Sequence, residues 1–211
     1  MLPVVVCAIG VGGCLLAEAR GRPGWLWLAK PVASAAFLWA ALAWGAAGSG
    51  VGLALLAGLA LCALGDVLLI RPGAGPLLHA GMAAFGLGHL SFAAAFFGHG
   101  VSWPILSAGA AATALLAAAA WRWLGPRLAM ADRLPVALYV FVISSMLAGA
   151  VGALGAGAPA ALAVGAALFA ASDLAVAQDR FVAPSFASTL WGLPAYYTAQ
   201  LAIAHGAGAL G

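Results

Sequence analysis

Two aspartates lie alone inside long apolar runs of this sequence, and they are the side chains best suited to do chemistry. Asp66 lies in residues 60–70 (ALCALGDVLLI), and Asp173 lies in residues 166–175 (AALFAASDLA). An ionisable group in hydrocarbon costs several kcal/mol, with values from about 2.5 kcal/mol upward depending on the method, so such residues are rarely accidental. The pair predicts one polar site between two helices.

Two carboxyl groups in one site can carry out general acid–base chemistry. Burial and a neighbouring carboxylate both favour the protonated form of a carboxyl group, so one group can keep a proton while the other is ionised. Such a pair suits hydrolysis of an acid-labile bond. It equally suits a small proton-coupled transporter, and the spacing does not separate the two. Structural roles also stay open: Asp66 could pair with Arg71, and Asp173 could bridge helices through Ser172.

The composition predicts the class of fold that positions these acids. The chain has 211 residues, of which 66% are hydrophobic and only 6% are charged, and its mean hydropathy is +1.13. Soluble domains carry about 25% charged residues, and apolar runs of about 20 residues span a bilayer as α-helices. We expect an all-α polytopic membrane protein with a single domain over residues 1–211. The net charge of +3 is too small to indicate a nucleic-acid partner.

Apolar runs separated by charges, prolines and glycines predict a bundle of eight transmembrane helices. Most prolines fall near a predicted helix start, where a missing N–H costs nothing. Pro194 falls inside the last run and should kink that helix. The predicted spans are residues 2–18, 31–47, 51–70, 76–97, 103–123, 134–154, 159–178 and 185–205.

The basic residues predict the orientation of the bundle. Every lysine and arginine falls in or beside alternate connections, and the connections between them have none; the residues are Arg20, Arg22, Lys30, Arg71, Arg122, Arg127, Arg133 and Arg180. Cytoplasmic loops carry the excess of Lys and Arg. We therefore expect a multi-pass protein of the cell (inner) membrane, with both termini on the non-cytoplasmic side and the two acids near its cytoplasmic face.

Further polar side chains fall at comparable depth, by the helical rise of about 1.5 Å per residue. Lys30 and Tyr139 lie near the charged end of their spans, whereas four others lie nearer the middle: His89, Tyr196, Tyr197 and Gln200. Together they predict a polar pocket that opens to the cytoplasm. Lys30 could instead be an interfacial anchor, and His89 could make a packing hydrogen bond beside Ser91.

Metal or disulfide chemistry is not indicated by the sequence. Cys7, Cys14 and Cys62 all fall within predicted spans, without CxxC spacing or an adjacent histidine, and are interpreted as small apolar side chains. One central histidine with two aspartates is not a supported ligand set. We expect neither a metal nor a cofactor, and the sequence does not predict the oligomeric state.

An ordered set of motifs resembles the YhhN/TMEM86 family of membrane proteins, whose characterised members are lysoplasmalogenases. The matching segments run from the second predicted span to the eighth: residues 30–31 (KP), 64–69 (LGDVLL), 85–92 (FGLGHLSF), 138–140 (LYV), 165–173 (GAALFAASD) and 196–200 (YYTAQ). Each motif is short, but their order and spacing cover nearly the whole chain.

The resemblance implies an ether hydrolase that cleaves the vinyl ether of a lysoplasmalogen, a lysophospholipid, to a fatty aldehyde and glycerophosphoethanolamine or glycerophosphocholine. A vinyl ether hydrolyses by protonation at carbon, followed by capture of the oxocarbenium ion by water. Asp66 and Asp173 are expected to serve as acid and carboxylate, with the assignment open, as in glycosidase pairs. Lys30 would meet the headgroup phosphate, and the remaining polar side chains would position water or the glycerol hydroxyl.

Overall fold

The computed structural model describes residues 1–70 and 75–210, and these residues form eight long α-helices. Short 3₁₀ or π turns connect some of them. The helices are α1 (Leu2–Ala19), α2 (Leu26–Ala43), α3 (Gly50–Leu68), α4 (Pro76–His99), α5 (Trp103–Leu124), α6 (Met130–Gly155), α7 (Ala160–Ala177) and α8 (Phe186–Gly208). The turns are η1 (Pro23–Trp25), η2 (Ala46–Gly48), η3 (Gly125–Arg127) and η4 (Gln178–Val182).

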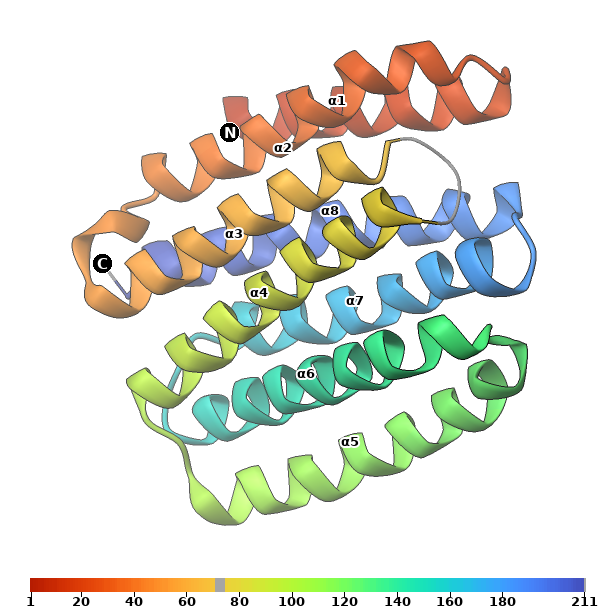
Figure 1. Cartoon of the computed structure of the whole chain (residues 1–211). Helices are drawn as coiled ribbons and strands as arrows, with labels where there is room; N and C mark the ends of the chain where they lie inside the picture. Colours follow the sequence, from red (N-terminus) through yellow and green to blue (C-terminus); the bar gives the residue numbers. More distant parts are fainter. Residues whose placement is uncertain (71–74, 211) are drawn as a thin grey trace.

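The helices run up and down beside one another, so alternate connections gather at the same end of the bundle (Figure 1). Helix α3 packs against α4 and α8, and α7 packs against α6 and α8. Helices α1 and α5 lie at opposite margins of the view in Figure 1. The helices that carry the two aspartates are therefore internal to the bundle, with α8 packed against both of them.

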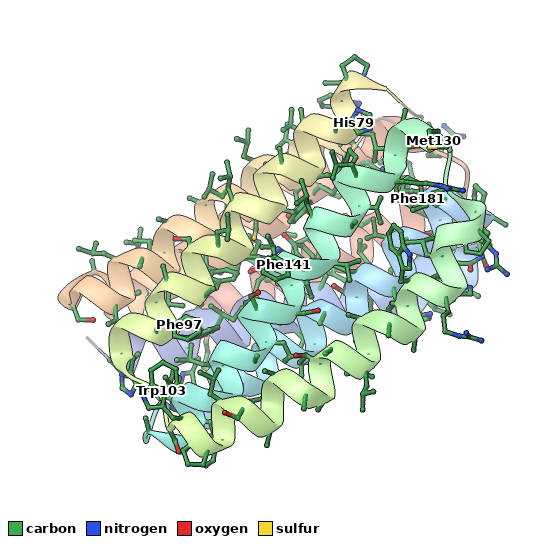
Figure 2. All side chains as sticks on the ribbon, turned by 60° about the horizontal axis from the view of Figure 1, so that its bottom comes forward. His79, Phe97, Trp103, Met130, Phe141 and Phe181 are labelled. Atoms are coloured by element: carbon green, nitrogen blue, oxygen red, sulfur yellow. The ribbon has the colours of Figure 1, made fainter. Side chains whose placement is uncertain are left out.

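One end of the bundle holds the basic residues. It contains the α1–α2, α5–α6 and α7–α8 connections, and Figure 2 shows His79, Met130 and Phe181 at this end with Phe97 and Trp103 at the other. Apart from Arg71, which lies outside the described residues, every lysine and arginine lies at or near this charged end. The predicted sorting of charges is present in the fold, and the side of the membrane that it faces stays a prediction.

Seven helices in the described part of the chain are long and apolar enough to cross a membrane. Helix α8 is not among them, although it has 23 residues. Its sequence carries Ser, Thr, Gln and two Tyr side chains, which lower its hydropathy, and many of its residues are buried against other helices. All eight predicted helices form; that the eighth crosses the membrane stays a prediction.

The start of the second span was predicted five residues too late. Helix α2 begins at Leu26 and ends at Ala43, so Pro31 lies inside it instead of at its first turn. Pro135 likewise lies inside α6, which begins at Met130. Each proline is the sixth residue of its helix, beyond the first four N–H groups that have no partner within the helix, so each leaves the carbonyl group four residues earlier without its helical hydrogen bond. Lys30 is consequently a residue within α2, one turn past its start.

Small residues let α3 and α4 approach closely. A Cβ atom added to Gly88 would lie 2.8 Å from Cys62 Sγ and 3.1 Å from the Gly58 carbonyl oxygen. Small side chains at such positions allow helix backbones to pack directly in a membrane, where van der Waals contact replaces the hydrophobic drive. This contact fixes the rotation of α3 and α4 relative to each other, and with it the directions of Asp66 and His89.

Gly88→Ala is therefore expected to destabilise the bundle. Overpacking of a close interior contact costs about 1–3 kcal/mol, which outweighs the gain of about 0.5–1 kcal/mol when alanine replaces a helical glycine. The midpoint of thermal unfolding in detergent should fall for Gly88→Ala. Gly98→Ala is the matched control in the same helix, because a Cβ atom there meets nothing within 4 Å. Equal midpoints for the two variants would contradict the prediction.

Candidate active site

Asp66 is held at the centre of a cluster of hydroxyl groups. Its carboxylate oxygen Oδ2 accepts hydrogen bonds from Ser34 Oγ at 2.6 Å and from Tyr196 Oη at 2.8 Å. Tyr197 Oη lies at 3.5 Å from the same atom, at the limit of a hydrogen bond. Short O–H···O contacts of this kind are typical of a charged acceptor. Three helices, α2, α3 and α8, therefore meet at this one carboxylate.

The other oxygen of Asp66 faces Lys30. Lys30 Nζ lies 4.0 Å from Asp66 Oδ1, and the two side chains are 15% and 4% exposed. A buried carboxylate is stable only where charge and hydrogen-bond partners compensate for lost water. Lys30 thus faces the site from α2, in addition to lying near the charged end. The alternative partner Arg71 lies outside the described residues.

Asp173 has a different set of partners. Its Oδ1 accepts a hydrogen bond from Tyr139 Oη at 3.4 Å, and its Oδ2 lies 3.5 Å from His89 Nε2. His89 is fully buried, whereas the Asp173 side chain is 16% exposed. Ser172, the suggested bridging residue, instead donates to the carbonyl oxygen of Phe169 in its own helix. Asp173 therefore stands between His89 on one side and open space on the other.

That open space is a cavity of about 1230 Å³. Both Asp66 and Asp173 line it, with Lys30, Tyr139 and Tyr196. It reaches the charged end at Glu18, Pro23 and Arg180, and it continues between α5, α6 and α7 along apolar and small side chains such as Leu116, Ala120, Ile143, Ala167 and Ala170. One compartment therefore joins two acids, a polar mouth and an apolar groove.

The remaining residues predicted for the site lie behind its wall. His89 and Tyr197 do not line the cavity and contact it through Asp173 and Asp66. Gln200 is fully buried beside Cys62 and does not line the cavity either. The structure thus brings Lys30, Tyr139 and Tyr196 to the cavity together with the acids, whereas Gln200 lies outside its lining. In the described part of the chain, no group of three or more His, Cys, Asp or Glu side chains is arranged to hold a metal.

Two residues of this site were missed by reasoning from sequence. Ser34 follows Lys30 by one helical turn, so both project from one face of α2, and that spacing is the signal that could have found it. Arg180 lies at the cavity mouth and donates from its guanidinium to the Leu69 carbonyl oxygen at 2.8 Å. The sequence marked Arg180 only as a loop charge, and only the fold brings η4 beside the end of α3.

Replacing Tyr196 by Phe should reduce turnover more than replacing Tyr197. A hydrogen bond to a charged group contributes about 1.5–3 kcal/mol, which corresponds to roughly 10- to 100-fold in rate. Tyr196 makes the short contact with Asp66 and Tyr197 only a long one, so we expect that loss for Tyr196→Phe and a smaller one for Tyr197→Phe. Steady-state kinetics of the two purified variants test this order, and the reverse order would contradict it.

Fold and site define a polytopic all-α membrane protein with two aspartates lining one cavity that reaches the charged end of its bundle. The chain belongs to the YhhN family, whose model matches residues 25–207. It is also similar to the lysoplasmalogenase TMEM86A of Bos taurus, at 33% identity over 156 residues, which cover 71% of this chain. The matched region spans 63% of the length of that relative. No solved structure matches the chain.

Proposed function

We propose that this protein is a membrane-embedded hydrolase that cleaves the vinyl ether bond of a lysoplasmalogen. The products would be a fatty aldehyde and glycerophosphoethanolamine or glycerophosphocholine. The observation that carries the proposal is that Asp66 and Asp173, from α3 and α7, line one cavity that also has an apolar groove and a polar mouth with Lys30 and Arg180. Membership of the YhhN family and similarity to a lysoplasmalogenase support it.

The reaction needs one carboxylic acid and one carboxylate. The acid protonates the alkenyl carbon that lies farther from the ether oxygen, and this step creates an oxocarbenium ion. The carboxylate stabilises the cation and takes a proton from the water that attacks it, which gives a hemiacetal. Collapse of the hemiacetal releases the aldehyde and the glycerol hydroxyl. Two carboxyl groups divide acid and base work in this way when their surroundings differ, as those of Asp66 and Asp173 do.

Each part of the lipid would lie in a different part of the cavity. The single hydrocarbon chain would lie in the groove between α5, α6 and α7, whose small and apolar side chains resemble the bilayer interior. The headgroup phosphate would lie at the mouth, where Lys30 and Arg180 supply positive charge. Guanidinium and ammonium groups bind phosphate by charge-assisted hydrogen bonds. Tyr139 and Tyr196 would then position water or the glycerol oxygen beside the acids.

The charged end would face the cytoplasm of the cell (inner) membrane. Basic residues gather at this end, and the positive-inside rule assigns such connections to the cytoplasm. Both termini would then lie on the non-cytoplasmic side. A lysolipid in the inner leaflet would enter with its headgroup at the polar mouth and its chain toward the midplane.

The test is aldehyde release by the purified protein from three matched lysolipids. Alkenyl, alkyl and acyl lysophosphoethanolamines share a headgroup and a chain, but only the alkenyl lipid has a carbon that an acid can protonate to give an oxocarbenium ion. We expect aldehyde from the alkenyl lipid alone. In D₂O the promptly trapped aldehyde should carry one deuterium at the carbon beside the carbonyl, because that carbon receives the catalytic proton.

Two outcomes would overturn the proposal. Cleavage of the acyl lipid at a comparable rate would indicate an esterase. Lipid or proton flux in proteoliposomes without aldehyde release would indicate the transporter that the same acids could also serve.

A further inference from the structure

The hydrogen bond of His89 to its own helix fixes which ring nitrogen carries a proton. His89 Nδ1 lies 2.7 Å from the carbonyl oxygen of Phe85. A carbonyl oxygen can only accept, so Nδ1 must donate. In the neutral ring Nε2 then has a lone pair and no hydrogen, and this lone pair is directed at Asp173, whose Oδ2 lies 3.5 Å away.

Two buried acceptor atoms therefore face each other. Among the described residues, neither His89 Nε2 nor Asp173 Oδ2 has another hydrogen-bond partner, and both atoms are buried. Two lone pairs in contact repel, whereas one proton between them satisfies both atoms. The arrangement calls for one shared proton, either on the Asp173 carboxyl group or on the His89 ring.

Asp66 has more donors around it than Asp173, to which Tyr139 alone donates, at 3.4 Å, among the described residues. Ser34 and Tyr196 both donate to it, and the Lys30 ammonium group faces its second oxygen. Donors and a cation favour the ionised form of a carboxyl group. The nitrogen of His89 that faces Asp173 can accept a proton, whereas the nitrogen of Lys30 that faces Asp66 is a cation. The two acids therefore differ in what they can give to a substrate.

We propose that Asp173 is the catalytic acid, that His89 is the positioning residue that holds its proton, and that Asp66 is the carboxylate. This assignment rests on the proposed function, and it states which aspartate is the acid and which is the carboxylate. The carboxyl group of Asp173 rotates to carry its proton from the side of His89 to the cavity and delivers it to the alkenyl carbon, and the π electrons form the new C–H bond as an oxygen lone pair forms the oxocarbenium ion. Water adds and gives a proton to Asp66. As the hemiacetal collapses, Asp66 returns a proton to the departing glycerol oxygen. The hydroxyl group of the hemiacetal loses its proton to Asp173, which again shares a proton with His89.

The first experiment looks for the shared proton in the resting protein, without substrate. A proton on Asp173 gives an infrared carboxylic acid C=O band that Asp173→Asn removes and Asp66→Asn retains. A proton on His89 instead gives a ¹⁵N imidazolium signal that His89→Asn removes. Either result supports the proposal. Absence of both, or a carboxylic acid band that only Asp66→Asn removes, overturns it. Because no turnover is measured, this result is separate from the success or failure of the proposed function.

The second experiment separates proton holding from packing at His89. The amide of glutamine falls near the position of Nε2 and faces Asp173, whereas that of asparagine falls near Nδ1 and faces Phe85. We expect kcat to fall about 10- to 100-fold for His89→Asn, the range of one strong hydrogen bond, and to fall less for His89→Gln, with KM little changed in both. A role in packing alone predicts the reverse order, because asparagine keeps the bond to Phe85. That order, or an effect on KM alone, would overturn the proposal.

If the wild-type protein releases no aldehyde, the proposed function fails and the spectroscopic result still decides where the proton lies.

Discussion

Asp66→Asn is expected to lower aldehyde release by at least about 10²-fold, the low end of what a positioned acid or base contributes. Asparagine has the same shape and keeps an oxygen that can accept from Ser34 and Tyr196, so the packing of α2, α3 and α8 should persist. It has no negative charge to stabilise an oxocarbenium ion, and it cannot take a proton from water. The loss should therefore appear in kcat.

Asp132→Asn is the matched control for the Asp66 variant. Asp132 makes a 2.9 Å contact with His79 at the charged end of the bundle, and both side chains are partly exposed there. Exposed ion pairs contribute about 0–1 kcal/mol, so this change should leave aldehyde release near the wild-type rate. Measurement of kcat, KM and the thermal midpoint for both variants separates catalysis from folding. Near-wild-type turnover of a folded Asp66→Asn protein would contradict a catalytic role for this carboxylate.

Asp173→Asn should cause a loss of similar size for a different reason. The amide cannot supply the proton that begins the reaction, although it can still contact Tyr139 and His89. Protonation at carbon is the difficult step for a vinyl ether, so turnover should fall by at least about 10²-fold. Binding should change little, because the headgroup and hydrocarbon chain would lie at other parts of the cavity. Kinetics with the alkenyl lysolipid give kcat and KM separately.

The double variant adds a sharper comparison. If the two acids act on one reaction coordinate, Asp66→Asn with Asp173→Asn together should lose less than the product of the two single losses, because residues that act as a unit are not additive. Losses that multiply fully would indicate independent roles. Wild-type turnover in Asp173→Asn would contradict its participation and leave Asp66 as the single acid of the site.

The sequence by itself determined the helices and their polarity. Long apolar runs must satisfy their backbone hydrogen bonds internally, so they form helices whatever their neighbours are. The cost of a charge in hydrocarbon singled out Asp66 and Asp173 before any fold was known. The alternation of basic and uncharged connections likewise fixed which helix ends lie together. These properties depend on residue type and local order along the chain.

Tertiary structure alone decided which side chains each acid meets. Whether Asp66 faces Ser34 or lipid depends on the rotation of α2 and α3, and close contacts such as that of Gly88 with Cys62 and Gly58 set such rotations. The sequence offered Tyr196, Tyr197 and Gln200 as equals, but one turn of α8 separates a short contact with Asp66 from a burial site by Cys62. A helix repeats every 3.6 residues, so depth can be counted along the sequence, whereas direction is fixed only when neighbouring helices pack.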